Sequence, residues 1–89
     1  SFAQVVSGRL VLDTIKRAED SDDLVLRLYE PLGHRGVAQV RLAGRITQAT
    51  YTNALEEPTE PATVKDGILE IPYRPFQIIT VKVSKEAGQ

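Results

Sequence analysis

Two segments of the chain alternate, with a period of two, between side chains that suit a core and side chains that suit water. In the first, LVLRLY at residues 24–29, Leu24, Leu26 and Leu28 fall on one face. The second, VAQVRL at residues 37–42, repeats the pattern. This is the period of a β-strand with one buried face, and no window of about 11 residues has the helical period of about 3.6 residues. The alternation therefore predicts an all-β chain.

Four further segments favour strands because they are rich in β-branched and apolar residues. They are residues 10–15, 46–51, 68–71 and 76–83. Sequences typical of turns separate these segments. They are DSDD (20–23), PLGHRG (31–36) and DG (66–67). About seven strands at spacings of about ten residues are typical of an antiparallel β-sandwich, which is the fold that we predict.

Three local expectations accompany this fold. Residues 15–19 (IKRAE) have the composition of one short helical turn. The segment EEPTEP, residues 56–61, is predicted to be a loop, because its two prolines suit neither a helix nor a central strand. Phe76 is predicted to pack inward at the start of the last strand, with Ile78 on the same side.

Length and charge limit the possible partners. With 89 residues the chain is long enough for one small domain, which we expect at 1–83, followed by a flexible tail at 84–89. The 11 Lys and Arg residues against 12 Asp and Glu leave a net charge of −1, without the basic excess that nucleic acids or anionic membranes attract. No apolar run approaches the roughly 20 residues that span a bilayer. We therefore expect neither a nucleic acid nor a membrane as a partner.

The chain contains no cysteine and no methionine. The lack of cysteine excludes disulfides, thiolate metal sites and a cysteine nucleophile, and it favours a cytoplasmic location. Because a complete natural chain starts with methionine, Ser1 is expected to be a cut point within a longer protein.

The stretch DDLVLRLYEPLGHRG, residues 22–36, holds the candidate functional residues. By alternation Glu30 falls on the core face of its strand, where an unpaired carboxylate would be costly. We expect Glu30 to accept hydrogen bonds from an arginine or from backbone N–H groups and so to hold the following turn in place. A contact between Glu30 and a partner surface is the alternative.

Arg27 and Tyr29 lie on the opposite face of that strand, together with Val25. Arginine and tyrosine are typical interface residues, so this face is either solvent-exposed or covered by another domain. The turn that follows carries His34 and Arg35 between two glycines. It is predicted to be a hairpin turn, and the alternative is a small anion-binding turn.

No catalytic or metal site is predicted within the chain. His34 is the single histidine and has no neighbouring set of ligands, whereas a zinc site needs three or four. The acidic residues gather at 20–23 and 56–57, in segments that are typical of solvated turns rather than of a catalytic pair.

Several segments, in order, resemble the C-terminal end of family 38 glycoside hydrolases, which are α-mannosidases. They are TIKRAED (14–20), LRLYEP (26–31) with Gly33, NALEE (53–57) and RPFQIIT (74–80). The similarity runs from about Val11 to Val83 and is greater to the bacterial and cytosolic branch of the family.

The resemblance implies a noncatalytic C-terminal β-sandwich domain that packs on and supports the catalytic domain of its parent enzyme. Members of the family are zinc-dependent retaining enzymes that hydrolyse terminal α-linked mannose. Their catalytic residues and zinc ligands lie in an upstream domain, so the resemblance assigns no catalytic residue and no cofactor to this chain. It implies that the partners are the remaining domains of the parent and, through the parent, mannose-containing glycans.

The resemblance also singles out possible contacts with another domain or with the rim of a substrate site. They are Arg27, Tyr29, Glu30, His34 and Arg35. Two other classes of function stay open. One is an autonomous carbohydrate-binding module, for which the chain supplies only three tyrosines and no tryptophan. The other is an Ig-like interaction module.

Overall fold

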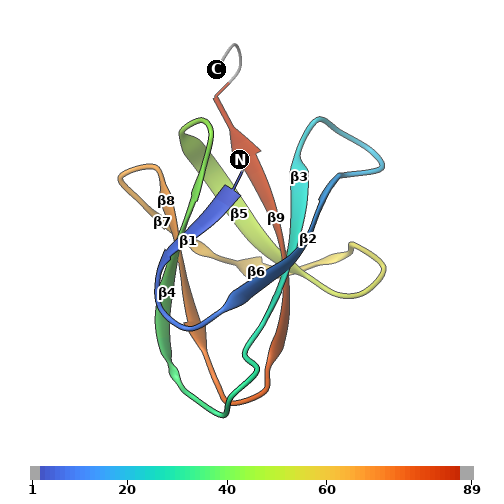
Figure 1. Ribbon diagram of the computed structural model, residues 1–89. Coiled ribbons are helices and arrows are strands. Elements are labelled where there is room, and N and C mark those ends of the chain that lie inside the picture. The colour runs from blue at the N-terminus through green and yellow to red at the C-terminus, as the bar shows by residue number, and fades with distance from the viewer. Residues whose placement is uncertain (1–2, 87–89) are drawn as a thin grey trace.

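The computed structural model describes residues 3–86, and Figure 1 shows them as two antiparallel sheets packed face to face. The first sheet has the strand order β1-β4-β8-β7. Its strands are β1 (Ala3–Ser7), β4 (Gly36–Leu42), β7 (Thr63–Lys65) and β8 (Ile68–Tyr73). The second sheet has the order β2-β3-β9-β5-β6. Its strands are β2 (Val11–Arg17), β3 (Leu24–Tyr29), β5 (Ile46–Thr52), β6 (Pro58–Pro61) and β9 (Ile78–Lys85).

The predicted all-β sandwich is confirmed, with nine strands in the described part of the chain rather than about seven. The strands outside the six segments named from the sequence are β1, β6 and β7. Residues 3–86 contain no helix long and apolar enough to cross a membrane.

The core lies between the sheets and consists of the side chains that the alternation placed there. On β3, Leu26 and Leu28 are fully buried, and they lie opposite Val81 and Ile79 of β9. On β4 the buried positions are Ala38, Val40 and Leu42, all part of the core cluster. Ala38 and Val40 lie opposite Ile71 and Leu69 of β8. Burying one face of each sheet against the other supplies the main driving force for folding.

The segment 56–61, predicted to be a loop, in part forms an edge strand. Residues 58–61 pair with β5 on one side only, at the end of the second sheet. A proline lacks the N–H that a central strand must donate, but at an edge that position faces outward and the proline is tolerated. The two prolines of this segment therefore indicate a strand at the edge of the sheet rather than a loop.

Two expectations at strand ends were also wrong. The helical turn considered for 15–19 does not form, because β2 continues to Arg17 in register with β3. At the C-terminus β9 continues through Ser84 and Lys85, which were assigned to a tail, and the Glu86 N–H donates to the Arg45 carbonyl. The remaining residues of that tail, 87–89, lie outside the described residues.

The Asp66-Gly67 turn is confirmed as the connection between β7 and β8. Both residues have positive φ, 54° and 78°. Such values are typical of the two-residue hairpin turn whose twist matches that of the flanking strands.

Candidate functional site

The segment after β3 connects the two sheets and is not the hairpin turn that the sequence predicted. Strand β3 pairs with β2 and β9, whereas β4 pairs with β1 and β8 in the other sheet. Residues 30–35 therefore cross the end of the sandwich. The β8–β9 connection, residues 74–77, crosses the same end, at the bottom of Figure 1.

Glu30 joins these two connections from the inside. Its side chain is fully buried, and its carboxylate accepts hydrogen bonds from the backbone N–H groups of Leu32 (3.2 Å), Gly33 (2.6 Å) and Phe76 (3.0 Å). Its own N–H donates to the Gln77 carbonyl at 3.0 Å. The predicted role of Glu30 in holding the turn by backbone hydrogen bonds is thus confirmed. The structure adds that Glu30 also holds the second connection.

These hydrogen bonds determine the charge state of Glu30. Burial alone would raise the pKa of the carboxyl group, because it penalises the charged form. Hydrogen bonds from the N–H groups of Phe76, His34, Gly33 and Leu32 outweigh burial and lower the pKa of Glu30 from 4.5 to about 2. The carboxylate is therefore charged at neutral pH.

His34 and Arg35 lie in the connection, beside Glu30. The Nδ1 atom of His34 is 3.4 Å from the Oε2 atom of Glu30, without the geometry of a hydrogen bond. The side chain of His34 is half-exposed and that of Arg35 is exposed. Both are free to meet a partner surface.

Tyr29 and Arg27 point to the outer face of the second sheet. Tyr29 lies opposite Val11 of β2 and Ile78 of β9, so that three apolar side chains form a row across three strands. Arg27 is exposed two residues away on the same face. Val25, predicted to share the face with them, is buried between its cross-strand neighbours Lys16 and Lys82.

Phe76 was predicted to pack inward and does not. It lies in a turn with a φ of 59°, its side chain is 68% exposed, and strand β9 starts only at Ile78. The Gln77 N–H donates to the Arg74 carbonyl across this turn. Pro75 is the second turn residue and Phe76 the third, a position with positive φ in type II turns. The proline was the signal for a turn that sequence reasoning missed.

The predicted site residues do not converge on one point. Glu30 points inward, Arg27 and Tyr29 point outward from the second sheet, and His34 and Arg35 lie at the end of the sandwich. Within residues 3–86, no three His, Asp or Glu side chains lie close enough together to hold a metal ion.

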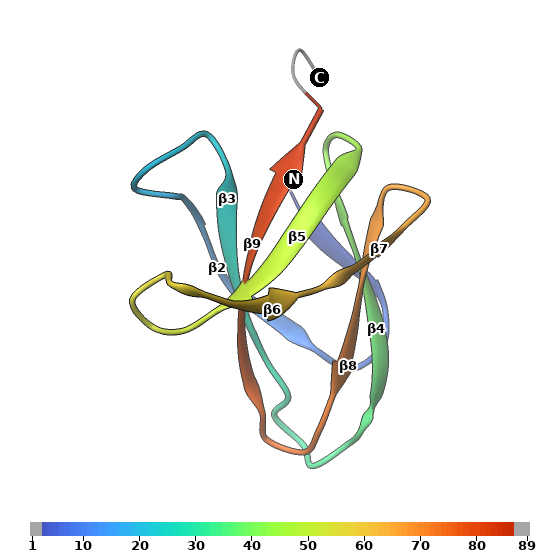
Figure 2. The same cartoon turned by 180° about the vertical axis from the view of Figure 1, so that it is seen from behind.

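An open cleft of about 740 Å³ is lined by residues of β8 and β9, together with residues of β4, β5 and β6. Figure 2 shows the course of these strands, with β6 crossing above the lower parts of β8 and β9. Strand β5 pairs with β9 only from Val81 onward, so the start of β9 has no neighbour on its β5 side. Strand β7 pairs with β8 only as far as Glu70, so the end of β8 has no neighbour on its β7 side. Polar and aromatic side chains line the cleft. They include Arg35, Tyr51, Glu60, Tyr73, Arg74 and Gln77.

A family profile and two curated relatives that match this chain all point to the same group of enzymes. The profile of a family described as the glycosyl hydrolases family 38 C-terminal β-sandwich domain matches residues 9–81. Alpha-mannosidase 2C1 of Homo sapiens is 36% identical over 87 residues, which are 91% of this chain and 8% of that protein. Alpha-mannosidase 2C1 of Mus musculus is 35% identical over 83 residues, which are 88% of this chain and 8% of that protein. The chain thus spans less than a tenth of the length of these relatives.

Proposed function

The chain belongs to the family of C-terminal β-sandwich domains of family 38 glycosyl hydrolases, and from this premise we propose that it is a noncatalytic domain of an α-mannosidase. The observation that carries the proposal is the match over residues 9–81, nearly the whole chain, with relatives named as α-mannosidases. The domain packs on the remaining domains of a parent enzyme and supports its catalytic domain. The parent hydrolyses terminal α-linked mannose in glycans of the cytoplasm.

The ionised state of three acidic side chains argues against a general acid among them. A general acid must hold a proton near neutral pH, and Glu30, with a pKa of about 2 and backbone N–H groups on both oxygens, does not. Hydrogen bonding and charge from Lys82 hold the pKa of Asp20 below its usual value. The hydrogen bond from Lys16 does the same for Glu56. The carboxylates of Asp20 and Glu56 thus belong to ion pairs with Lys82 and Lys16.

The zinc that the family resemblance implies does not fit this chain. The single histidine, His34, has its Nδ1 atom against the buried carboxylate of Glu30, and the described residues offer no group of three ligands. We therefore assign the zinc to the catalytic domain of the parent enzyme.

Hydrolysis of an aryl α-mannoside tests the proposal. The purified chain and the full-length parent enzyme are assayed side by side with added divalent metal. We expect turnover by the parent and none by the chain alone. Turnover by the chain would overturn the noncatalytic role, and a folded, metal-loaded parent without activity would count against the assignment to an α-mannosidase.

Glycan contact through the cleft is a second candidate, favoured by the presence of Arg35, Tyr51 and Glu60 in its lining. Polar groups beside aromatic rings are the usual lining of small-molecule sites. In the full-length enzyme, Arg35→Ala would then lower kcat/KM for a mannoside. The matched control is Arg41→Ala, an exposed arginine on β4 outside the cleft lining. Equal kcat/KM values for the Arg35→Ala, Arg41→Ala and wild-type enzymes would eliminate this candidate.

A further inference from the structure

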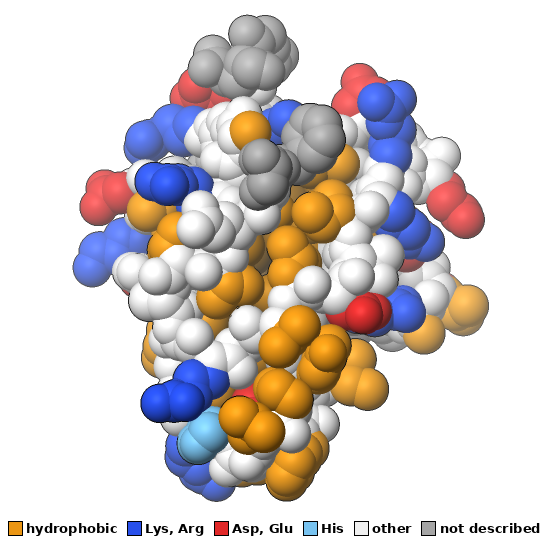
Figure 3. Space-filling model, in the orientation of Figure 1, with side chains coloured by type: hydrophobic (Ala, Val, Ile, Leu, Met, Phe, Trp, Pro, Cys, Tyr) orange, Lys and Arg blue, Asp and Glu red, His pale blue; other side chains and the backbone are white. Residues whose placement is uncertain are grey.

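Several exposed apolar side chains gather at the end of the sandwich where the two connections cross. Leu32 is 70% exposed, Phe76 68% and Ile78 72%, and Tyr29 and Val11 continue the group across β3 and β2. We call these five residues the apolar tip. Figure 3 shows a group of hydrophobic side chains at this lower end, beside the single histidine. A contiguous exposed apolar surface of this kind usually marks an interaction site.

The apolar tip is built rigidly. Leu32 and Phe76 come from different connections, and the buried carboxylate of Glu30 accepts a backbone N–H from each. The Phe76 ring lies over Gly33, so close that a Cβ atom at that glycine would be 3.1 Å from it. Side chains held in place before binding lose less entropy when a partner covers them.

Phe76 is displayed at a cost to the sandwich itself. A bulky residue at a φ of 59° is a genuine outlier, since glycine or asparagine would adopt that conformation more readily. The strained turn presents most of an aromatic ring to solvent, where the ring contributes little to folding. Strain that persists at a displayed side chain points to a function for that side chain.

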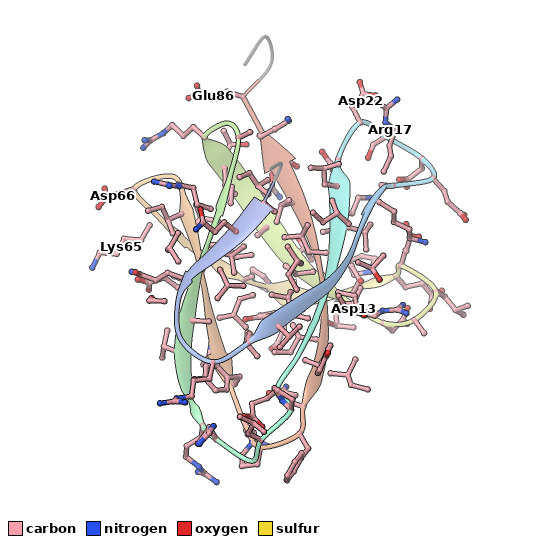
Figure 4. All side chains as sticks on the ribbon, viewed as in Figure 1. Asp13, Arg17, Asp22, Lys65, Asp66 and Glu86 are labelled. Carbon is pink, nitrogen blue, oxygen red and sulfur yellow. The ribbon has the colours of Figure 1, made fainter. Side chains whose placement is uncertain are left out.

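Two exposed arginines carry the charge of the connections beside the apolar tip. Arg35 and Arg74 lie in the two connections, whereas Arg27 on β3 and Asp13 on β2 each lie two residues from the tip and have opposite charges. The negative charge of Glu30 is buried beneath the two connections. Of the charged side chains labelled in Figure 4, Asp13 on β2 lies lowest, two residues from Val11 of the apolar tip. A complementary surface is therefore apolar at its centre and acidic at the part of its rim that meets the arginines of the connections.

We propose that the apolar tip docks into an apolar pocket with an acidic rim on another part of the same parent polypeptide. This proposal rests on the proposed function. About nine-tenths of the length of the matched relatives lies outside the segment that resembles this chain, so a parent of that kind has ample surface to supply the pocket.

Hydroxyl-radical footprinting of the intact parent enzyme tests the proposal with a matched internal control. Leu32 and Leu55 are the same residue type and nearly equally exposed, at 70% and 78%, but Leu55 lies in the β5–β6 loop, away from the apolar tip. We expect Leu32 to be oxidised about tenfold more slowly than Leu55, as for a side chain at the centre of an interface. The denatured enzyme supplies the reference in which both leucines react alike.

A double variant separates docking from folding. The double variant Phe76→Asn/Ile78→Thr removes apolar bulk from the tip. Asparagine tolerates the positive φ at position 76 and keeps the backbone N–H that donates to Glu30, and threonine at position 78 suits a strand. In the intact enzyme this variant should raise the oxidation rate of Leu32 to that of Leu55, whereas Leu55→Asn should leave Leu32 protected.

Oxidation of Leu32 as fast as that of Leu55 in the wild-type enzyme would overturn the proposal. So would protection that disappears when the enzyme is diluted to single chains, since the occupant would then be a second copy. Loss of kcat/KM in the double variant with Leu32 still protected would also overturn it, in favour of a contact with substrate. The footprint requires no catalytic activity, so its failure is separable from failure of the mannoside assay.

Discussion

Replacing Glu30 with alanine should lower the melting temperature of the chain by about 10 °C or more. The substitution leaves the N–H groups of Leu32, Gly33 and Phe76 at a buried site without their acceptor. A buried N–H group without an acceptor has lost its hydrogen bonds to water and gained none in return, so it destabilises the fold more than the loss of a surface contact does. The substitution also removes the hydrogen bonds that link the two connections at the end of the sandwich. Thermal unfolding followed by circular dichroism at pH 7 measures the effect.

The matched control is Glu60→Ala, which removes a glutamate from the exposed edge strand β6. Surface substitutions of this kind usually change stability little. Equal melting temperatures for the two variants would show that the Glu30 hydrogen bonds do not hold the fold together.

The same carboxylate should make the fold sensitive to acid. The pKa of Glu30 is about 2 in the folded chain, below its ordinary value of 4.5, so the folded state favours the charged form. Its contribution is complete above the unfolded pKa and is lost as the pH falls from about 5 towards 2. Glu30→Gln, which cannot titrate, should therefore have a melting temperature that falls less over this range than that of the wild-type chain. Parallel acid profiles would contradict the assignment.

Truncating Leu28 to alanine should cost about 2–5 kcal/mol of unfolding free energy. Leu28 has no exposed surface, faces Ile79 of β9 across the sheet, and lies in the cluster that joins the two sheets. The cost combines the lost burial of the side chain with the cavity that its neighbours fill only in part. For a domain of this size the loss is a large share of the total stability.

Urea denaturation of Leu28→Ala and Leu55→Ala separates the core from the surface. Leu55 is 78% exposed, so its truncation should change the unfolding free energy by no more than about 0.5 kcal/mol. A shift of the Leu28→Ala midpoint no larger than that of Leu55→Ala would mean that Leu28 is not in the folded core.

Strand β3 and the residue after it show how much of the structure can be predicted from local sequence pattern. Alternation along 24–29 correctly placed Leu26 and Leu28 in the core, and it extended to Glu30, whose need for hydrogen-bond donors followed from burial alone. The source of the third donor did not follow, because Phe76 lies 46 residues further along the chain. A pairing at that separation depends on which strands become neighbours.

The sheet to which each strand belongs was equally beyond local pattern. The turn-like composition of 31–36 is the same for a hairpin and for a connection between sheets, so a hairpin was predicted where the chain changes sheets. Prolines at 58 and 61 excluded a central strand, but only the sheet order shows that an edge was available there.

Local sequence pattern was enough to predict the fold class, the inward faces of β3 and β4 and the buried acceptor, and the resemblance to a family gave the kind of protein to which the chain belongs. These follow from periodicity and from the cost of burying charge, which act over a few residues. The outward position of Phe76, and the surface that Leu32, Phe76 and Ile78 share with Tyr29, follow from the arrangement of the sheets. Their meeting requires two strands and two connections to be in place, because residues so distant in sequence become neighbours only when the sheets close on each other.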